Sequence, residues 1–155
     1  MDKRIRDAHN AIEATPVAKA LADGSISKSV YRQYLENALE IWKALDRRYL
    51  LAGQLGIADR LMYDLRRLGG PFFGPTPAAR RHAENANDAD MRTLGLGLCY
   101  GGKIMARQLA DKDLPASHMA GMPKWAISTL KNINVSQDER VRAFQDAAGW
   151  YQDGA

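Results

Sequence analysis

Apolar positions recur at helical spacing along almost the whole chain. In the first segment the stripe consists of Ile5, Ala8, Ile12, Val17 and Leu21. These three- and four-residue steps mark one face of a helix. They predict a helix from about residue 2 to residue 22. Pro16 should bend or break it, because proline has no N–H for the helical hydrogen-bond ladder.

The strongest amphipathic pattern covers residues 26–54. A serine, Ser25 or Ser27, stands where the cap of a helix is expected. The inner stripe consists of Val30, Tyr34, Leu35, Ala38, Ile41, Trp42, Leu45 and Tyr49. One long helix with a broad apolar face is therefore predicted here.

The remainder of the chain also follows the helical period. Further helices are predicted over residues 57–68, from residue 78 onward, and over 89–109, 124–132 and 137–152, with loops at 69–77 and 111–123. No segment alternates apolar and polar residues with a period of two. The expected fold class is all-α, a multi-helix bundle forming a single domain over residues 1–155.

Composition and charge narrow the classes of partner. The 155 residues include 22 basic and 18 acidic side chains, a net charge of +4, which suits an anionic ligand or an acidic protein partner. The basic residues are mixed with acidic ones and form no recognised nucleic-acid motif, so no nucleic-acid partner is expected. The single cysteine, Cys99, excludes an intramolecular disulfide. No apolar run reaches membrane-spanning length. A cytoplasmic monomer without a membrane partner is expected.

Four glycines interrupt the predicted helix at residues 89–109. Gly95, Gly97, Gly101 and Gly102 fall within eight residues, and each costs a helix interior about 0.5–1 kcal/mol relative to alanine. Missing side chains allow a flat, large ligand to lie against the backbone, or allow another helix to pack closely. Both interpretations remain open from the pattern alone.

Only one of the three histidines stands on an apolar helical face. His9 lies beside Ala8 and Ile12, with Glu13 one turn on. In this arrangement a carboxylate can accept a hydrogen bond from Nδ1–H and leave Nε2 free for a metal. His82 and His118 lie in polar, loop-like sequence and are predicted to be exposed. A histidine on one helix and bare glycines on another suit a planar metal macrocycle such as haem.

Two blocks of the sequence resemble haem oxygenases. The first is "AHNAIEATPVAKALADGSISKSVYRQYLENALEIWKALD", which has the family's proximal histidine and the glutamate four residues later (His9 and Glu13). The second is "GLCYGGKIM", which matches the glycines of the family's distal motif G-D-x-S-G-G at Gly97, Gly101 and Gly102. The resemblance covers most of the chain, with a shortened middle.

The resemblance implies a bundle that holds haem between a proximal helix and a kinked distal helix. It implies a haem oxygenase, which uses haem as both cofactor and substrate and converts it to biliverdin, CO and ferrous iron. O2 and electrons from a reductant such as ferredoxin are consumed. His9 would be the iron ligand, and the distal helix would be a steric wall. Residues expected to contact haem are Arg6, His9, Glu13, Arg92, Gly97, Leu98, Gly101, Gly102 and Lys131, and His9, Gly97 and Gly101 are the expected catalytic positions.

One departure from the family pattern concerns proton delivery. Many members have an aspartate immediately after the first glycine of the distal motif, and this chain has Leu98. Leucine holds no water, so the proton source would be water on backbone carbonyls or a polar side chain such as Tyr100.

Other functions remain open. A non-catalytic haem carrier or sensor of the same fold is the main alternative, because of Leu98. A thiaminase-like protein of this fold class would leave His9 and Glu13 unexplained. A nucleic-acid-binding bundle is suggested only by the basic isoelectric point of about 9.3.

Overall fold

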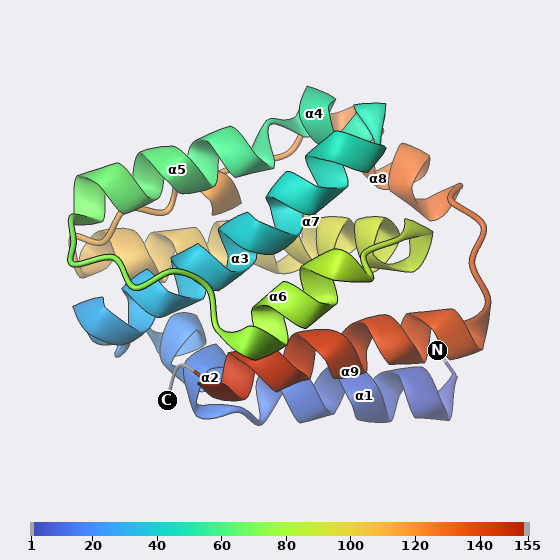
Figure 1. Ribbon diagram of the computed structural model, residues 1–155, viewed down its shortest axis with the longest axis horizontal. Coiled ribbons are helices and arrows are strands. Elements are labelled where there is room, and N and C mark those ends of the chain that lie inside the picture. Colours follow the sequence, from blue (N-terminus) through green and yellow to red (C-terminus); the bar gives the residue numbers. More distant parts are fainter. Residues whose placement is uncertain (1, 154–155) are drawn as a thin grey trace.

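The computed structural model describes residues 2–153, and every regular element in that range is helical (Figure 1). The α-helices are α1 (Lys3–Glu13), α2 (Pro16–Asp23), α3 (Lys28–Arg48), α4 (Leu50–Leu55), α5 (Ile57–Leu68), α6 (Pro77–Glu84), α7 (Asp88–Asp111), α8 (Lys124–Lys131) and α9 (Gln137–Asp153). A single 3-10 turn, η1 (Ser117–Met119), precedes α8. The all-α expectation is confirmed.

The break predicted at Pro16 is confirmed, and its local cause is visible. Helix α1 ends at Glu13, and α2 begins with Pro16 as its first helical residue. The Thr15 side chain caps α2 by accepting a hydrogen bond from the N–H of Ala18. Proline is favoured at this position because its missing N–H has no intrahelical partner there in any case.

The helix predicted over residues 26–54 is shorter than expected. Helix α3 stops at Arg48, where Tyr49 takes an extended conformation (φ −128°, ψ 122°), and the short α4 follows. The turn brings Ala52 and Leu55 into the core, where they are 0% and 2% exposed. Arg48 also donates to the carbonyl of Ala86, 2.7 Å away, which ties the end of α3 to the start of α7. Good helix formers surround Tyr49, so propensity does not reveal this break.

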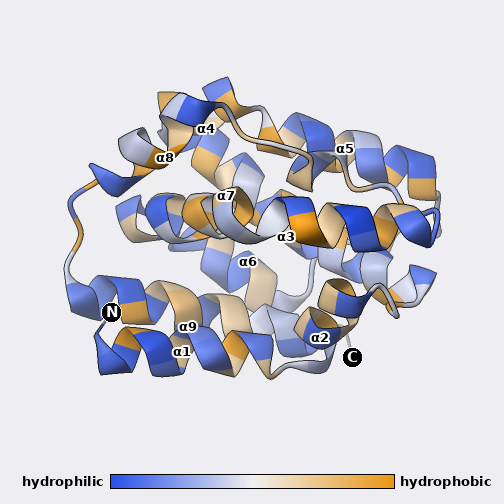
Figure 2. Cartoon of the chain, turned by 180° about the vertical axis from the view of Figure 1, so that it is seen from behind, coloured by the Kyte–Doolittle hydropathy of each residue, from blue (hydrophilic) through white to orange (hydrophobic). Residues whose placement is uncertain are grey.

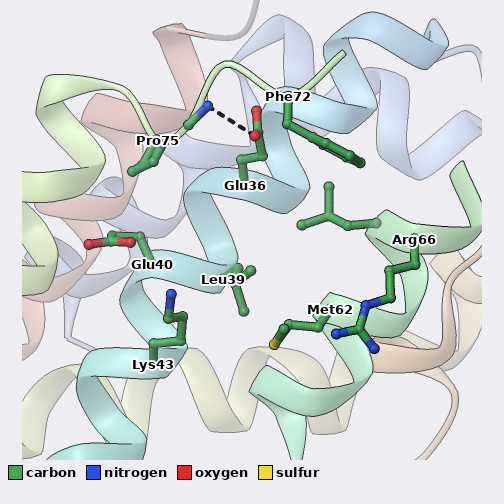
Figure 3. Close-up of a pocket in the computed structure, with 10 residues that line it drawn as sticks. Glu36, Leu39, Glu40, Lys43, Met62, Arg66, Phe72 and Pro75 are labelled. Carbon is green, nitrogen blue, oxygen red and sulfur yellow. Dashed lines mark hydrogen bonds between the residues drawn. The ribbon is translucent and has the colours of Figure 1, made fainter. Parts of the chain in front are cut away.

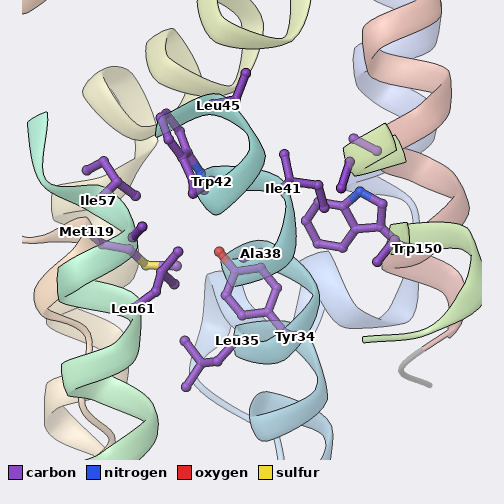
Figure 4. Packing of buried hydrophobic residues seen from close by; sticks show 14 of the residues in the cluster. Tyr34, Leu35, Ala38, Ile41, Trp42, Leu45, Ile57, Leu61, Met119 and Trp150 are labelled. Atoms are coloured by element: carbon purple, nitrogen blue, oxygen red, sulfur yellow. The ribbon is translucent and has the colours of Figure 1, made fainter. Parts of the chain in front are cut away.

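The core is organised around α3, which packs against α5 and α6. Most of its predicted inner stripe is buried, with Leu35, Ile41 and Leu45 completely so. Figure 4 shows Tyr34, Ile41 and Trp42 lying among side chains from α5, η1 and α9. Burial of side chains of this size stabilises the fold by about 1.5–3 kcal/mol each.

Helices α1 and α9 lie side by side, as both ribbon views show (Figures 1 and 2). Helix α7 packs against α2, α8, α9 and η1, so α1 and α7 share α9 as a neighbour. Figure 2 also shows that many residues of α1 and α5 are hydrophilic. Within residues 2–153, no helix has the length and apolar character needed to cross a membrane.

Candidate functional site

His9 is accessible on α1. Its side chain is 42% exposed, and its Nε2 atom lies 3.5 Å from Oε1 of Glu13, which is also exposed. The ring nitrogen nearest Glu13 is therefore Nε2, whereas the sequence predicts that Nδ1 faces the carboxylate. The imidazole meets the ring of Phe144 on α9 edge-on, with centroids 5.6 Å apart. The histidine thus packs on an aromatic ring while its side chain stays accessible to a ligand.

The four glycines of α7 divide into two pairs. A Cβ atom on Gly95 would lie 2.8 Å from Leu130 Cδ1, and one on Gly102 would lie 2.8 Å from the carbonyl oxygen of Met119. These two glycines allow α8 and η1 to approach the helix. In contrast, nothing lies within 4 Å of a Cβ placed on Gly97, and a Cβ on Gly101 would meet only the end of Met105. Close packing of helices explains why Gly95 and Gly102 are glycines, but it does not explain Gly97 and Gly101.

This division predicts opposite effects of alanine at two glycines of one helix. Gly97→Ala should raise the free energy of unfolding by about 0.5–1 kcal/mol, because helix propensity improves and no atom is displaced. Gly102→Ala should lower it by about 1–3 kcal/mol, because the new methyl group collides with a backbone carbonyl. Urea denaturation followed by circular dichroism measures both values. Equal effects of the two substitutions would contradict the division.

Of the three basic residues expected to contact the ligand, two are exposed and one is already hydrogen-bonded within the protein. Arg6 and Lys131 are exposed, and Lys131 Nζ lies 5.6 Å from the centre of the Tyr100 ring. Arg92 donates from Nη1 to the carbonyl of Ile133 at 3.0 Å, and its Nε is buried without a hydrogen-bond partner. Leu98 is half-buried against the core. Arg6 and Lys131 are therefore free to meet an anion, whereas Arg92 is already engaged.

Helix α7 packs against α2 near its C-terminal end, and charged side chains meet near its N-terminal end. At the start, Arg140 of α9 lies near both Arg92 and Asp2; burial and the charge of Arg92 lower its pKa, and Asp2 opposes them. At the far end, a Cβ on Gly24 would lie 2.9 Å from the carbonyl oxygen of Gln108.

Two pockets, of about 260 and 300 Å³, lie elsewhere, and neither is lined by His9 or by a residue of α7.

The expectation that His82 is exposed is wrong. His82 is 2% exposed, and Trp150 Nε1 donates to its Nδ1 at 2.8 Å. Its Nε2 lies 2.7 Å from Asp90 Oδ1, so the proton of the neutral ring stands on Nε2. A signal was present in the sequence, because Ala79, His82, Ala83 and Ala86 form an i, i+3, i+4, i+7 stripe.

The expectation for His118 is wrong in the same way. His118 is 2% exposed, and its Nδ1 lies 2.7 Å from Asp64 Oδ2. Asp64 also accepts from the Ser117 hydroxyl at 2.7 Å and from the N–H groups of Ser117 and His118 at 2.9 and 3.0 Å. On its other side, His118 Nε2 lies 3.4 Å from the Tyr34 hydroxyl. The pair fastens η1 to α5, and no local pattern marks a histidine in a polar loop as buried.

His82, Asp90 and Asp146 form a group with possible metal-ligand atoms within 4.8 Å of one another. Arg142 already supplies the positive charge here, with ion pairs to Asp90 at 3.4 Å and to Asp146 at 2.5 Å. Burial alone would raise the pKa of Asp90, but hydrogen bonds from His82 and Asn87 and the charge of Arg142 hold it below its usual value. Both nitrogens of His82 are also engaged. The group therefore joins α6, α7 and α9 as a hydrogen-bonded network.

No family model matches the chain, and no curated protein matches it either.

Proposed function

We propose that the chain is a haem-binding protein that degrades haem to biliverdin, CO and ferrous iron, with His9 as the iron ligand. The observation that carries the proposal is the open pair of glycines. Gly97 and Gly101 each cost the interior of α7 about 0.5–1 kcal/mol, and the folded chain gains no close packing in return. A ligand lying against the bare backbone accounts for them.

The accessible side chains His9, Glu13, Arg6 and Lys131 have the chemistry that haem requires. His9 offers an accessible imidazole, and Glu13 Oε1, 3.5 Å from its Nε2, lies close enough to orient the ring. The exposed Arg6 and Lys131 suit the two carboxylates of haem. When bound, haem supplies the iron at which O2 is reduced by electrons from a donor such as ferredoxin.

The chain's own part in the reaction is to orient the ligand and move protons. His9 fixes the position of the iron, and the surface of α7 limits which edge of the ring is open. Leu98 can neither donate a proton nor hold a water molecule. Backbone carbonyls next to Gly97 can hold water, and a bridging water serves nearly as well as a direct hydrogen bond.

The first test is a haem titration of the purified protein followed by its Soret absorbance. His9→Ala should abolish the spectrum of histidine-ligated haem, because the iron loses its protein ligand. Added imidazole should restore the spectrum in His9→Gly. Asn10→Ala is the matched control, an exposed polar residue on the same helix. The buried His82 and His118 are unsuitable controls, because their loss would disturb the fold. An unchanged spectrum in His9→Ala would contradict the proposal.

Leu98 favours one alternative, a haem carrier or sensor that binds haem through His9 without turnover. Single turnover with ferredoxin and its reductase separates the two functions. Catalase is added to remove free peroxide, and an iron chelator traps the product metal. Biliverdin and CO appearing together support the oxygenase. Haem absorbance that persists under these conditions supports the carrier.

A further inference from the structure

Four large hydrophobic side chains of α5 and of the segment that follows it are exposed, and two of them, Met62 and Phe72, line one pocket. Met62 and Tyr63 on α5 are 37% and 51% exposed, and Phe72 and Phe73 are 55% and 79% exposed. Both phenylalanines belong to residues 69–76, here named the Phe loop, which runs along one end of the bundle between α5 and α6 (Figure 1). Adjacent large apolar side chains left in water mark an interaction surface.

The Phe loop is uncharged, and a pair of arginines stands on each side of it in the sequence. Residues 68–79 contain no charged side chain, and arginine pairs flank them, Arg66–Arg67 on one side and Arg80–Arg81 on the other. All four arginines are exposed, and within residues 2–153 none lies in ion-pair contact with a carboxylate. Arg80 reaches back to the loop, with Nη2 3.7 Å from the position of a Cβ on Gly74. An uncharged tip is thus flanked along the chain by four arginines without a carboxylate partner, of which Arg66 lies beside Phe72 and Arg80 beside Gly74.

The backbone of the Phe loop is held in place by side chains of α3. Glu36 accepts hydrogen bonds from the N–H groups of Phe73 and Gly74 at 3.3 and 3.0 Å, and Figure 3 shows this carboxylate under the loop. Gln33 donates to the carbonyl of Gly74 at 3.0 Å, and Arg32 donates to the carbonyl of Gly69 at 2.5 Å. The loop therefore has a fixed shape, in which Phe73 is 79% exposed and Phe72, 55% exposed, lies beside the pocket between α3 and α5 (Figure 3).

We propose that the Phe loop is a peripheral membrane-binding surface. Phe72 and Phe73 insert at the boundary between headgroups and acyl chains, and the four arginines contact lipid phosphates of an anionic bilayer. Insertion costs less for the N–H groups of Phe73 and Gly74 and for the carbonyl of Gly74, because Glu36 and Gln33 already bond them. A loop makes the contact, so no spanning helix is needed.

The same features argue against a second copy of the chain as the occupant. Two copies joined through this surface would bring eight unpaired arginines together, and like charges facing each other oppose association. The uncharged tip also offers no carboxylate to pair with them. Anionic phosphates match both the sign of the charge and the apolar tip that it surrounds.

The test is co-sedimentation of the haem-free protein with vesicles, which keeps the result independent of the proposed function. Phosphatidylcholine vesicles are compared with vesicles that also contain phosphatidylglycerol. The wild-type protein should sediment with the anionic vesicles and less with the neutral ones. Phe72→Ser with Phe73→Ser should lower the partition coefficient by about tenfold or more, because two apolar anchors are lost. Arg80→Gln with Arg81→Gln should weaken binding to the anionic vesicles only.

Matched control variants distinguish binding through the Phe loop from non-specific adsorption to the vesicles. Leu50→Ser with Ile104→Ser removes two apolar side chains that are 81% and 64% exposed elsewhere, and binding should be unchanged. Lys103→Gln with Arg107→Gln removes two exposed charges of α7 and should have a smaller effect than the Arg80–Arg81 change. Far-ultraviolet circular dichroism checks that each variant is folded. If the double phenylalanine variant does not fold, Phe73→Ser alone replaces it in the co-sedimentation test.

Three outcomes overturn the proposal. The first is no sedimentation of the wild-type protein with anionic vesicles. The second is sedimentation that the phenylalanine changes leave unaltered, which would mean adsorption by charge alone. The third is a wild-type dimer in sedimentation velocity that Phe73→Ser converts to a monomer, which would make the Phe loop a contact between copies.

Discussion

Asp64→Ala is expected to lower the free energy of unfolding by about 3–5 kcal/mol, because several hydrogen-bond donors lose their acceptor and each unsatisfied buried donor costs about 1–3 kcal/mol. Asp64 is fully buried and accepts hydrogen bonds from the His118 ring, the Ser117 hydroxyl and two backbone N–H groups. Alanine would remove this acceptor from all four donors, of which the Ser117 hydroxyl alone retains another in the carbonyl of Arg60. Denaturation by urea at pH 7 measures the loss, and Asp7→Ala on the surface of α1 is the control.

The effect of Asp64 should depend on pH. Burial alone would raise its pKa, but hydrogen bonds from His118 and Ser117 outweigh burial and hold it below the unfolded value of 3.8. A lowered folded-state pKa stabilises the protein above the unfolded pKa, and this stabilisation disappears as the pH falls through the folded-state pKa. The difference between the wild-type protein and Asp64→Asn should therefore shrink as the pH falls below about 4. A difference that stays constant down to pH 2 would show that the carboxylate charge contributes nothing.

Gly97→Leu is expected to reduce haem affinity by more than tenfold while leaving the fold stable. Nothing lies within 4 Å of a Cβ at this position, the glycine is exposed, and leucine improves helix propensity. The same side chain would occupy the space proposed for the haem ring. A loss worth 1.4 kcal/mol of binding free energy already equals tenfold in affinity.

Haem titration and urea denaturation of Gly97→Leu give the two required values. Gly149→Leu is the matched control, because Gly149 is an exposed glycine inside α9 where a Cβ would also meet no atom within 4 Å. Its haem affinity should equal that of the wild-type protein. If both leucine variants bind haem equally well, the open glycines of α7 do not form the haem site.

Local sequence features predicted most of the helical architecture. Helix α5 spans Ile57–Leu68 as its apolar period predicted, and Pro16 with the Thr15 cap separates α1 from α2. These features were readable because capping, the missing N–H of proline and a 3.6-residue period act within a few residues of backbone. The exception is Tyr49, where the break between α3 and α4 follows from the burial of Ala52 and Leu55.

The candidate site was only partly predictable. His9 and Glu13 lie one turn apart on one helix, so their proximity followed from helix geometry alone. Their relation to α7 depends on how both helices pack on α9, and no local pattern specifies that packing. The ligand that they hold stays a prediction.

The sequence by itself determined where the helices lie, which face of α3 is buried, and that four glycines weaken α7. Only the tertiary structure decided that Gly95 and Gly102 serve packing while Gly97 and Gly101 remain open. It also decided that His82 and His118 are buried, because their partners Asp90 and Asp64 lie 8 and 54 residues away along the chain. Backbone conformation follows from neighbouring residues, whereas the burial of a polar side chain depends on a partner that folding brings to it.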